Sequence, residues 1–425
     1  MRSLRSRGVV AVAAGLVTLV ALLSGCSGRD SVEIDLPPQV EGALPDETAA
    51  QLEAAVTSAM IATGSSGAIV GVWAPWSGSW VEGLGTQRPG GGGAVDTDMA
   101  FRAADVTRAM TCDVMFQVAA EGTIELDDSV TDYVNGFPDL KDVTLRQLCD
   151  GTAGIGAYTP QLQSQFFSNL ERQWDPRELA GYGLGQDRIE PGTEYRDSDS
   201  GYLLLGSALE RATGMSMREL LEERIAEPLD LAVTALPTRT AAPPADGPVL
   251  PGYWSTPNAE GAWNCTEPPE VTKMSASIGG ADSGAVTDIT DLGRYAQALA
   301  TGALTPDASD RFEAPLPVGA DQPTWFTAAG GAYQAGALIG QYGAIPGYLT
   351  AAFADPRTGM TVAVVLNNSG ANPNIGAWLA WELAAIASKA PAMEGESVPE
   401  AGLPWTAQQQ HDAILANAIC QPPAE

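Results

Sequence analysis

The chain has 425 residues, of which 52 are acidic and 22 are basic, so its formal net charge at pH 7 is −30. This length is enough to bury a large hydrophobic core. The negative charge excludes nucleic acid as a partner, because a protein that binds phosphates needs a basic surface. It also argues against attachment to anionic lipid through a polybasic segment. We interpret the charge as favouring solubility outside the cell rather than an acidic binding function.

Residues 1–25 have the features of a bacterial lipoprotein signal peptide. Three arginines among the first seven residues precede an apolar stretch from Val9 to Leu23, which is too short to remain as a transmembrane helix. The residues that follow, up to Cys26, resemble a bacterial lipobox, which implies cleavage before Cys26 and lipidation of its thiol. We therefore expect an exported protein, anchored by lipid to the outer face of the cytoplasmic membrane in the cell envelope.

Four further cysteines predict disulfide bonds. An even number of cysteines is typical of disulfides in an exported chain, and four cysteines allow three different pairings. No two cysteines have C-x-x-C spacing, and His411 is the chain's single histidine, so neither a zinc site nor a Cys/His nucleophile pair is expected. We expect no metal and no cofactor. The four residues are Cys112, Cys149, Cys265 and Cys420.

Composition and periodicity divide the chain into a signal peptide, a polar tether, one domain and a tail. Within the domain, helical periodicity occurs at 47–62 and 106–122, and β-prone runs occur at 67–84, at 329–339 and between 348 and 367. Strands near both ends with helices between them predict an α/β or α+β fold, in which both ends of the domain share one sheet. The predicted boundaries are 1–25 for the signal peptide, 26–46 for the tether, 47–390 for the domain and 391–425 for the tail.

Five segments of the domain carry motifs in a shared order. The first, Phe101-Arg-Ala-Ala-Asp-Val-Thr-Arg108, resembles the "F-R-x-x-S-x-T-K" segment of the serine β-lactamase and penicillin-binding-protein family. Class C β-lactamases, D-alanyl-D-alanine carboxypeptidases and related esterases are the most similar in pattern. The resemblance spans residues 50–390 and implies an antiparallel sheet flanked by helices, with an all-helical region beside it and the site between them. The other segments are 117–128, 143–154, 191–206 and 340–348.

The chemistry of this family needs a serine that attacks an acyl carbonyl and a lysine three residues later that keeps the serine deprotonated. A tyrosine in a Y-x-N motif relays protons, and a Lys/His-x-Ser/Thr-Gly strand orients the substrate carboxylate. The resemblance places other residues at these positions. Asp105 replaces the serine, Arg108 the lysine, Asp197 the tyrosine and Asp199 the asparagine, and the strand motif reads Gln341-Tyr342-Gly343.

Each replacement removes one chemical requirement. The Asp105 carboxylate is a poor nucleophile toward an amide, and Arg108 stays protonated, so it cannot act as a general base. Gln341 offers no positive charge to a substrate carboxylate, and the acidic residues nearby would repel one. No Ser-x-x-Lys occurs elsewhere, because Pro, Glu and Ile precede the three lysines at that spacing. These losses predict that the family mechanism cannot operate.

We therefore hypothesise a catalytically inactive homologue that acts in binding, scaffolding or regulation at the cell wall. The floor of its cleft would hold a polar network of Asp105, Asp197, Asp199 and Gln341, with Arg108 between the carboxylates. The expected partners are peptidoglycan fragments or another envelope protein. The protein is also expected to contact the membrane through its lipid anchor.

Two other functions stay open. A hydrolase of this family (a β-lactamase, a carboxypeptidase or an esterase) could use non-standard carboxylate chemistry, since paired carboxylates act as acid and base when their pKa values differ. A calcium loop is the second alternative, because Asp197-Ser-Asp-Ser-Gly201 is similar to the start of one. Its twelfth position is Ala208 instead of glutamate, so a polar turn before a helix is favoured. The scattered tryptophans predict no sugar-binding aromatic platform.

The resemblance also bears on the disulfides and on one further segment. Cys112 and Cys149 lie in two segments that meet near the site in the family, which implies that they are bonded and leaves Cys265 to pair with Cys420. The segment from Gly279-Gly280 to Leu292 resembles a family loop that leads into a helix, and we assign it a structural role.

Overall fold

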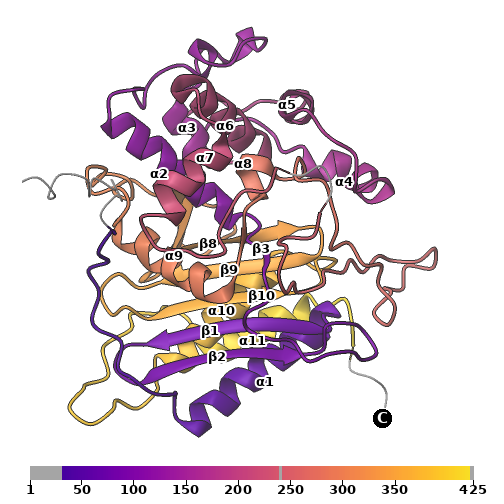
Figure 1. Cartoon of the computed structure of the whole chain (residues 1–425), viewed down its shortest axis with the longest axis vertical. Helices are drawn as coiled ribbons and strands as arrows, with labels where there is room; N and C mark the ends of the chain where they lie inside the picture. The colour runs from indigo at the N-terminus through magenta and orange to yellow at the C-terminus, as the bar shows by residue number, and fades with distance from the viewer. Residues whose placement is uncertain (1–30, 239–241, 422–425) are drawn as a thin grey trace, which may run out of the picture. The chain divides into compact units, whose positions relative to one another are not determined.

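The computed structural model describes residues 31–238 and 242–421, so the predicted signal peptide and Cys26 lie outside the described residues. One sheet of eight antiparallel strands runs through the domain (Figure 1). Its strands are β1 (Gly67–Ala74), β2 (Gly78–Gly85), β5 (Leu316–Pro317), β6 (Phe326–Ala329), β7 (Ala332–Ala335), β8 (Leu338–Ile345), β9 (Tyr348–Ala354) and β10 (Thr361–Leu366). The order β2-β1-β10-β9-β8-β7-β6-β5 pairs an early strand with a late one, as the sequence predicts.

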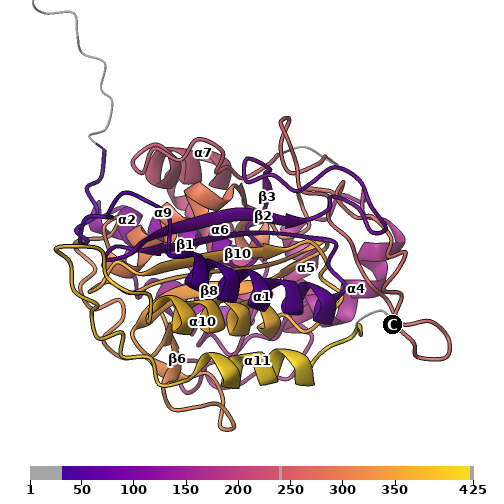
Figure 2. The same ribbon diagram turned by 90° about the horizontal axis from the view of Figure 1, so that it is seen from below.

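Both faces of the sheet are covered, and the composition of its central strands accounts for this. In β1, Ile69 packs into one hydrophobic core, whereas its neighbours Ala68 and Val70 pack into a second core on the other face. A strand buried on both faces is a continuous apolar run rather than an alternating one. The helix α9 (Ile289–Thr301) covers one face, and α1 (Asp46–Thr63), α10 (Asn374–Ala387) and α11 (Ala407–Ala416) lie together beside the other (Figure 2).

A helical region is inserted between the short strands β3 (Phe101–Arg102) and β4 (Val286–Thr287), which pair with each other. Figure 1 shows its helices gathered on one side of the sheet, which confirms the predicted all-helical region. The α-helices are α2 (Val106–Ala120), α3 (Leu145–Cys149), α4 (Thr159–Ser168), α5 (Pro176–Leu184), α6 (Asp199–Thr213), α7 (Met217–Leu221) and α8 (Gly280–Ser283). Single turns of other helix types lie at Val130–Asp132, Pro138–Leu140 and Glu222–Ala226.

Two features differ from the sequence interpretation. The run at 329–339 was expected as a strand, but tight turns divide it between β6, β7 and β8. Gly330, Gly331 and Gly336 have φ values of 59°, 77° and 55°, a left-handed conformation that glycine adopts without strain and that breaks a β-run. In addition, α11 lies beyond residue 390, where no helix was predicted, and packs against α10.

Both preferred disulfides are present, so that prediction is confirmed. Cys112–Cys149 joins α2 to α3, and Cys265–Cys420 joins the loop segment that contains Cys265, between residues 227 and 279, to the chain after α11. Within residues 31–238 and 242–421, no helix has both the length and the apolar composition needed to cross a membrane. The same ranges contain no group of three Cys, His, Asp or Glu residues placed to hold a metal ion.

Candidate functional site

Asp105 lies where strand β3 leads into helix α2. Ala104, just before it, has a φ of 49°, a left-handed conformation that residues with a side chain seldom adopt. The Asp105 side chain packs against β8, where a Cβ atom at position 343 would collide with its carboxylate. Gly343 is therefore needed for Asp105 to occupy this place. Two motifs that lie far apart in the sequence are thus in direct contact.

The Arg108 side chain, on the first turn of α2, is held by three carboxylates. Its Nε lies 2.7 Å from Oδ1 of Asp282, and its Nη1 lies 2.5 Å from Oδ1 of Asp197 and 3.5 Å from Oδ2 of Asp105. The guanidinium also lies over the ring of Tyr202, 5.1 Å from its centroid. Arg108 is only 4% exposed, and these partners offset the cost of burying its charge.

Asp282 is the acidic residue that the sequence interpretation missed. It lies in α8, just after Gly279 and Gly280, whose φ values are 102° and 48°. These two glycines allow a sharp turn that places α8 against α2 and α6. The two adjacent glycines could have indicated this part of the site in the sequence. Such a pair, next to a family motif, marks a place where the backbone closely approaches another segment. The structural role assigned to the segment is therefore incomplete, since it also supplies a carboxylate to Arg108.

Two predicted members of the network have other partners. Both oxygens of the Asp199 carboxylate accept backbone hydrogen bonds at the start of α4, from Tyr158 at 2.6 Å and from Thr159 at 2.8 Å. The Gln341 side chain is buried and donates to the carbonyl of Gly331 at 3.0 Å. The prediction of a single network is wrong for Asp199 and Gln341, because buried backbone groups take up their hydrogen-bonding capacity.

A cavity of about 700 Å³, which we call the cleft, lies beside the ion cluster. Asp105, Arg108 and Asp197 line it, so the replaced side chains do not fill it. Its volume falls within the range of roughly 300–1,000 Å³ that is usual for small-molecule sites. Aromatic side chains form another part of its wall. The ring centroids of Trp254 and Phe167 lie 4.1 Å apart there. The site therefore combines a charged cluster with space for a ligand.

Comparison with known families assigns the chain. The sequence profile described as Beta-lactamase matches residues 52–385, which is most of the chain. The chain belongs to the β-lactamase family. The large antiparallel sheet with its helices agrees with the fold of this family, and the resemblance inferred from the motifs is confirmed.

Curated relatives of this β-lactamase family member match it over part of their length. Penicillin-binding protein 4* of Bacillus subtilis (strain 168) is 26% identical over 216 residues, which cover 48% of this chain and 45% of that protein. The D-alanyl-D-alanine-carboxypeptidase/endopeptidase AmpH of Escherichia coli (strain K12) is 27% identical over 161 residues, which cover 35% of this chain and 40% of that protein. The chain thus spans less than half the length of these relatives.

Solved structures match over a larger share. A D-stereospecific amidohydrolase from Streptomyces sp. has a TM-score of 0.66 at 26% identity, covering 77% of this chain and 95% of that chain. The octameric penicillin-binding protein homologue from Pyrococcus abyssi has a TM-score of 0.67 at 20% identity, covering 85% of this chain and 80% of that chain. At 20% identity, the likeness to the Pyrococcus abyssi protein shows a shared fold and carries no conclusion about function.

Burial changes the pKa values of the charged groups in the site. Burial raises the pKa of Asp105 well above its ordinary value and also raises the pKa of Asp282, although the charge of Arg108 opposes both shifts. Burial and the charge of Asp282 raise the pKa of Asp199 to about 6. Burial alone would lower the pKa of Arg108, but the surrounding carboxylates outweigh it and raise this pKa, so Arg108 stays charged.

We expect the stabilising contribution of these carboxyl groups to fall as the pH rises above about 4, and that of Asp199 to be lost near pH 6. A carboxyl group with a raised pKa binds its proton more tightly in the folded protein, so its contribution to stability is full below its ordinary pKa. That contribution is lost as the pH rises through the raised pKa. The variant Asp105→Asn cannot ionise and should show a shallower decline. Thermal unfolding followed by circular dichroism measures both curves, and parallel curves would show that the pKa of Asp105 is ordinary.

Proposed function

We propose that this protein is a catalytically inactive binding protein of the β-lactamase family, exported and held by lipid at Cys26 on the outer face of the cytoplasmic membrane. The ion cluster around Arg108 carries the proposal. At the position where the family mechanism needs a base, a buried guanidinium contacts three carboxylates. A guanidinium cannot take up a proton, so it cannot activate a nucleophile. The open cleft beside it supports binding in place of catalysis.

Four serines line the cleft, Ser164, Ser255, Ser283 and Ser369, and none of them is followed three residues later by a lysine. Of the described residues that line the cleft, none is a lysine or a histidine. The Ser255 hydroxyl donates to the carbonyl of Asn264, and the Ser369 hydroxyl accepts from the backbone N–H of Gly347. Removing the nucleophile of a serine enzyme lowers its rate on the order of 10⁶-fold.

The charge of the cleft indicates the class of ligand. Four carboxylates, those of Asp105, Asp197, Asp199 and Asp282, line it together with one guanidinium. Acidic side chains therefore outnumber the guanidinium in the lining by four to one. This balance favours a ligand with a free ammonium group and disfavours a carboxylate. The Asp197 side chain is 58% exposed and is the carboxylate that a ligand can reach most readily.

The names of the relatives suggest which ammonium-bearing ligand this is. They refer to D-alanyl-D-alanine, to D-amino acids and their amides, and to penicillin. For this chain we therefore propose a peptidoglycan fragment whose D-amino acid presents its ammonium group to Asp197. Another envelope protein with an exposed ammonium group would satisfy the same charge requirement.

Two peptides of opposite charge test this proposal. D-alanyl-D-alanine amide has an ammonium group and no carboxylate, whereas N-acetyl-D-alanyl-D-alanine has a carboxylate and no ammonium group. We expect isothermal titration calorimetry to show binding of the amide and at least about tenfold weaker binding of the acetylated peptide. Asp197→Asn should weaken binding of the amide about tenfold, which corresponds to ~1.4 kcal/mol.

Glu260→Gln is the matched control for Asp197→Asn. Glu260 is exposed and does not line the cleft, so its loss should leave the affinity for the amide unchanged. Preferential binding of the acetylated peptide, or equal effects of the two substitutions, would contradict the proposed ligand class.

One observation favours a hydrolase with carboxylate chemistry as a second candidate function. Burial raises the pKa of Asp105 well above its ordinary value, and the Asp105 and Asp197 carboxyl groups both contact the Arg108 guanidinium. A carboxyl group with a raised pKa can serve as a general acid, and a second carboxylate as a general base. Several relatives are hydrolases by name, including a D-aminopeptidase. Release of ammonia from D-alanyl-D-alanine amide, abolished by Asp105→Asn in a folded protein, would establish this function.

A further inference from the structure

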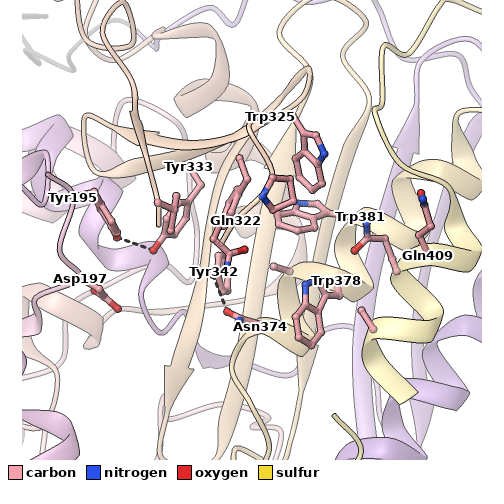
Figure 3. A pocket seen from close by; sticks show the side chains of 16 residues that line it. Tyr195, Asp197, Gln322, Trp325, Tyr333, Tyr342, Asn374, Trp378, Trp381 and Gln409 are labelled. Atoms are coloured by element: carbon pink, nitrogen blue, oxygen red, sulfur yellow. Dashed lines mark hydrogen bonds between the residues drawn. The ribbon is translucent and has the colours of Figure 1, made fainter. Parts of the chain in front are cut away.

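A second cavity, of about 360 Å³, opens between the sheet and the C-terminal helices, and we call it the aromatic pocket (Figure 3). Helix α10 lines it with Asn374, Trp378 and Trp381, which lie on one face because they are spaced four and then three residues apart. Helix α11 adds Gln409 and Gln410. The pocket shares Asp197 with the cleft, and the family mechanism gives the pocket no role.

Seven of the sixteen residues that line the aromatic pocket are aromatic. The rings of Trp325 and Trp381 lie edge to face, with centroids 5.5 Å apart, and those of Tyr333 and Tyr342 lie 5.0 Å apart. Trp325 and Trp378 are partly exposed. Packed rings of this kind offer a rigid apolar surface at a low cost in conformational entropy.

Four neutral amide side chains line the aromatic pocket, those of Gln322, Asn374, Gln409 and Gln410. Gln410 lines the aromatic pocket and is 6% exposed. Trp381 is 3% exposed, and its buried indole N–H has no hydrogen-bond partner in the described part of the chain. The Asn374 carbonyl oxygen accepts from the Tyr342 hydroxyl at 2.9 Å, which leaves the NH₂ group of Asn374 available. Buried polar groups without partners are rare and call for an explanation.

The charge of the aromatic pocket narrows the choice of ligand. Asp197 is the single charged residue among the described residues that line it, and no cationic side chain lines the pocket, so nothing there favours an anionic ligand. A purely apolar ligand would leave the buried indole N–H of Trp381 unpaired, at a cost in free energy. A neutral ligand with hydrogen-bonding groups and an apolar face fits this lining.

We propose that the aromatic pocket binds a neutral saccharide unit of a glycan. A pyranose ring presents C–H groups on one face, which stack on an indole ring, and hydroxyl groups around its edge, which hydrogen-bond to amides. The volume of the pocket lies within the usual range for small-molecule sites, near its lower end. This site is separate from the ammonium-binding role of the cleft and does not depend on it.

Titration with two neutral oligosaccharides tests the proposal. The probes are the tetrasaccharide of β-1,4-linked N-acetylglucosamine and maltotetraose, with a tetragalacturonate as the anionic comparison. We expect saturable binding of at least one neutral probe by calorimetry, together with a change in tryptophan fluorescence, and no binding of the anionic probe. Trp378→Ala should weaken this binding at least tenfold.

Trp263→Ala is the matched control, because Trp263 is exposed and lines the cleft instead of the aromatic pocket. It should change the affinity less than twofold. If Trp378→Ala fails to fold, Trp378→Tyr and Gln322→Ala decide the question by the same comparison, since Gln322 is exposed at the aromatic pocket. Binding of neither neutral probe, or binding that is lost in Trp263→Ala and kept in the pocket variants, overturns the proposal. Peptide binding in the cleft should persist in Trp378→Ala, so failure of one proposal is distinct from failure of the other.

Discussion

Replacing Arg108 with methionine should lower the free energy of unfolding by about 3–5 kcal/mol at neutral pH, because it leaves buried carboxylates without their counter-charge. Methionine fills much of the same space, so the effect reports the lost charge rather than a cavity. Asp105 and Asp282 would then have no opposing cation, and their pKa values should rise further. Both groups can avoid this penalty by binding protons, so the loss of stability should be smaller at acid pH than at neutral pH.

Urea unfolding at acid and neutral pH measures this effect, and Arg218→Met is its control. Arg218 pairs with Glu222 at a distance of 3.2 Å, but the two side chains are 47% and 51% exposed. An exposed pair of this kind contributes at most about 1 kcal/mol. Similar losses in the two variants, or a larger loss for Arg108→Met at acid pH, would contradict the described role of the ion cluster.

The double variant Cys112→Ala/Cys149→Ala should lose about 4 kcal/mol of stability. The disulfide joins two fully buried residues that are 37 positions apart, so its removal frees a long loop in the unfolded chain. It also joins α2, which carries Arg108, to α3. Urea unfolding of the variant and the wild type measures the difference.

Reduction without substitution provides a check on this second prediction. A reductant should lower the unfolding midpoint of the wild type and leave that of a variant lacking all four paired cysteines unchanged. A double variant within about 1 kcal/mol of the wild type would show that this crosslink contributes little to the folded state.

The main architecture was predictable because it depends on local patterns. The runs around Ile69 and Val364 are apolar at consecutive positions, as strands buried on two faces must be, and they occur near opposite ends of the domain. The run at 329–339 was misread because its glycines were taken as part of a strand, whereas their left-handed φ values form turns. Strand periodicity alone does not reveal the sign of φ.

The site was predictable only where motifs fix the register. Asp105, Arg108 and Asp197 were placed correctly near one another because conspicuous residues flank each of them in the sequence. The partners of Asp199 and Gln341 depend on the backbone of distant segments, namely the start of α4 and Gly331. The spacing of residues in the sequence does not predict such tertiary hydrogen bonds.

The aromatic pocket could not be predicted from the sequence either, because its residues come from distant segments. Trp325 and Trp378 are 53 positions apart in the printed sequence, and neither lies in a motif. They come together only because α10 packs beside the end of β6 and α11 closes the same side. The tryptophans are scattered in the sequence, whereas the fold brings them together with side-chain amides.

The most direct test of the absence of catalysis is covalent labelling with a fluorescent penicillin, combined with an assay of chromogenic cephalosporin hydrolysis. A serine enzyme of the β-lactamase family forms an acyl-enzyme with such compounds. With Asp105 and Arg108 at the reactive positions, we expect neither a labelled band nor turnover above the uncatalysed rate. A labelled band or measurable turnover, either one lost in the folded variant Asp105→Ala, would contradict the proposal that this family member binds without catalysis.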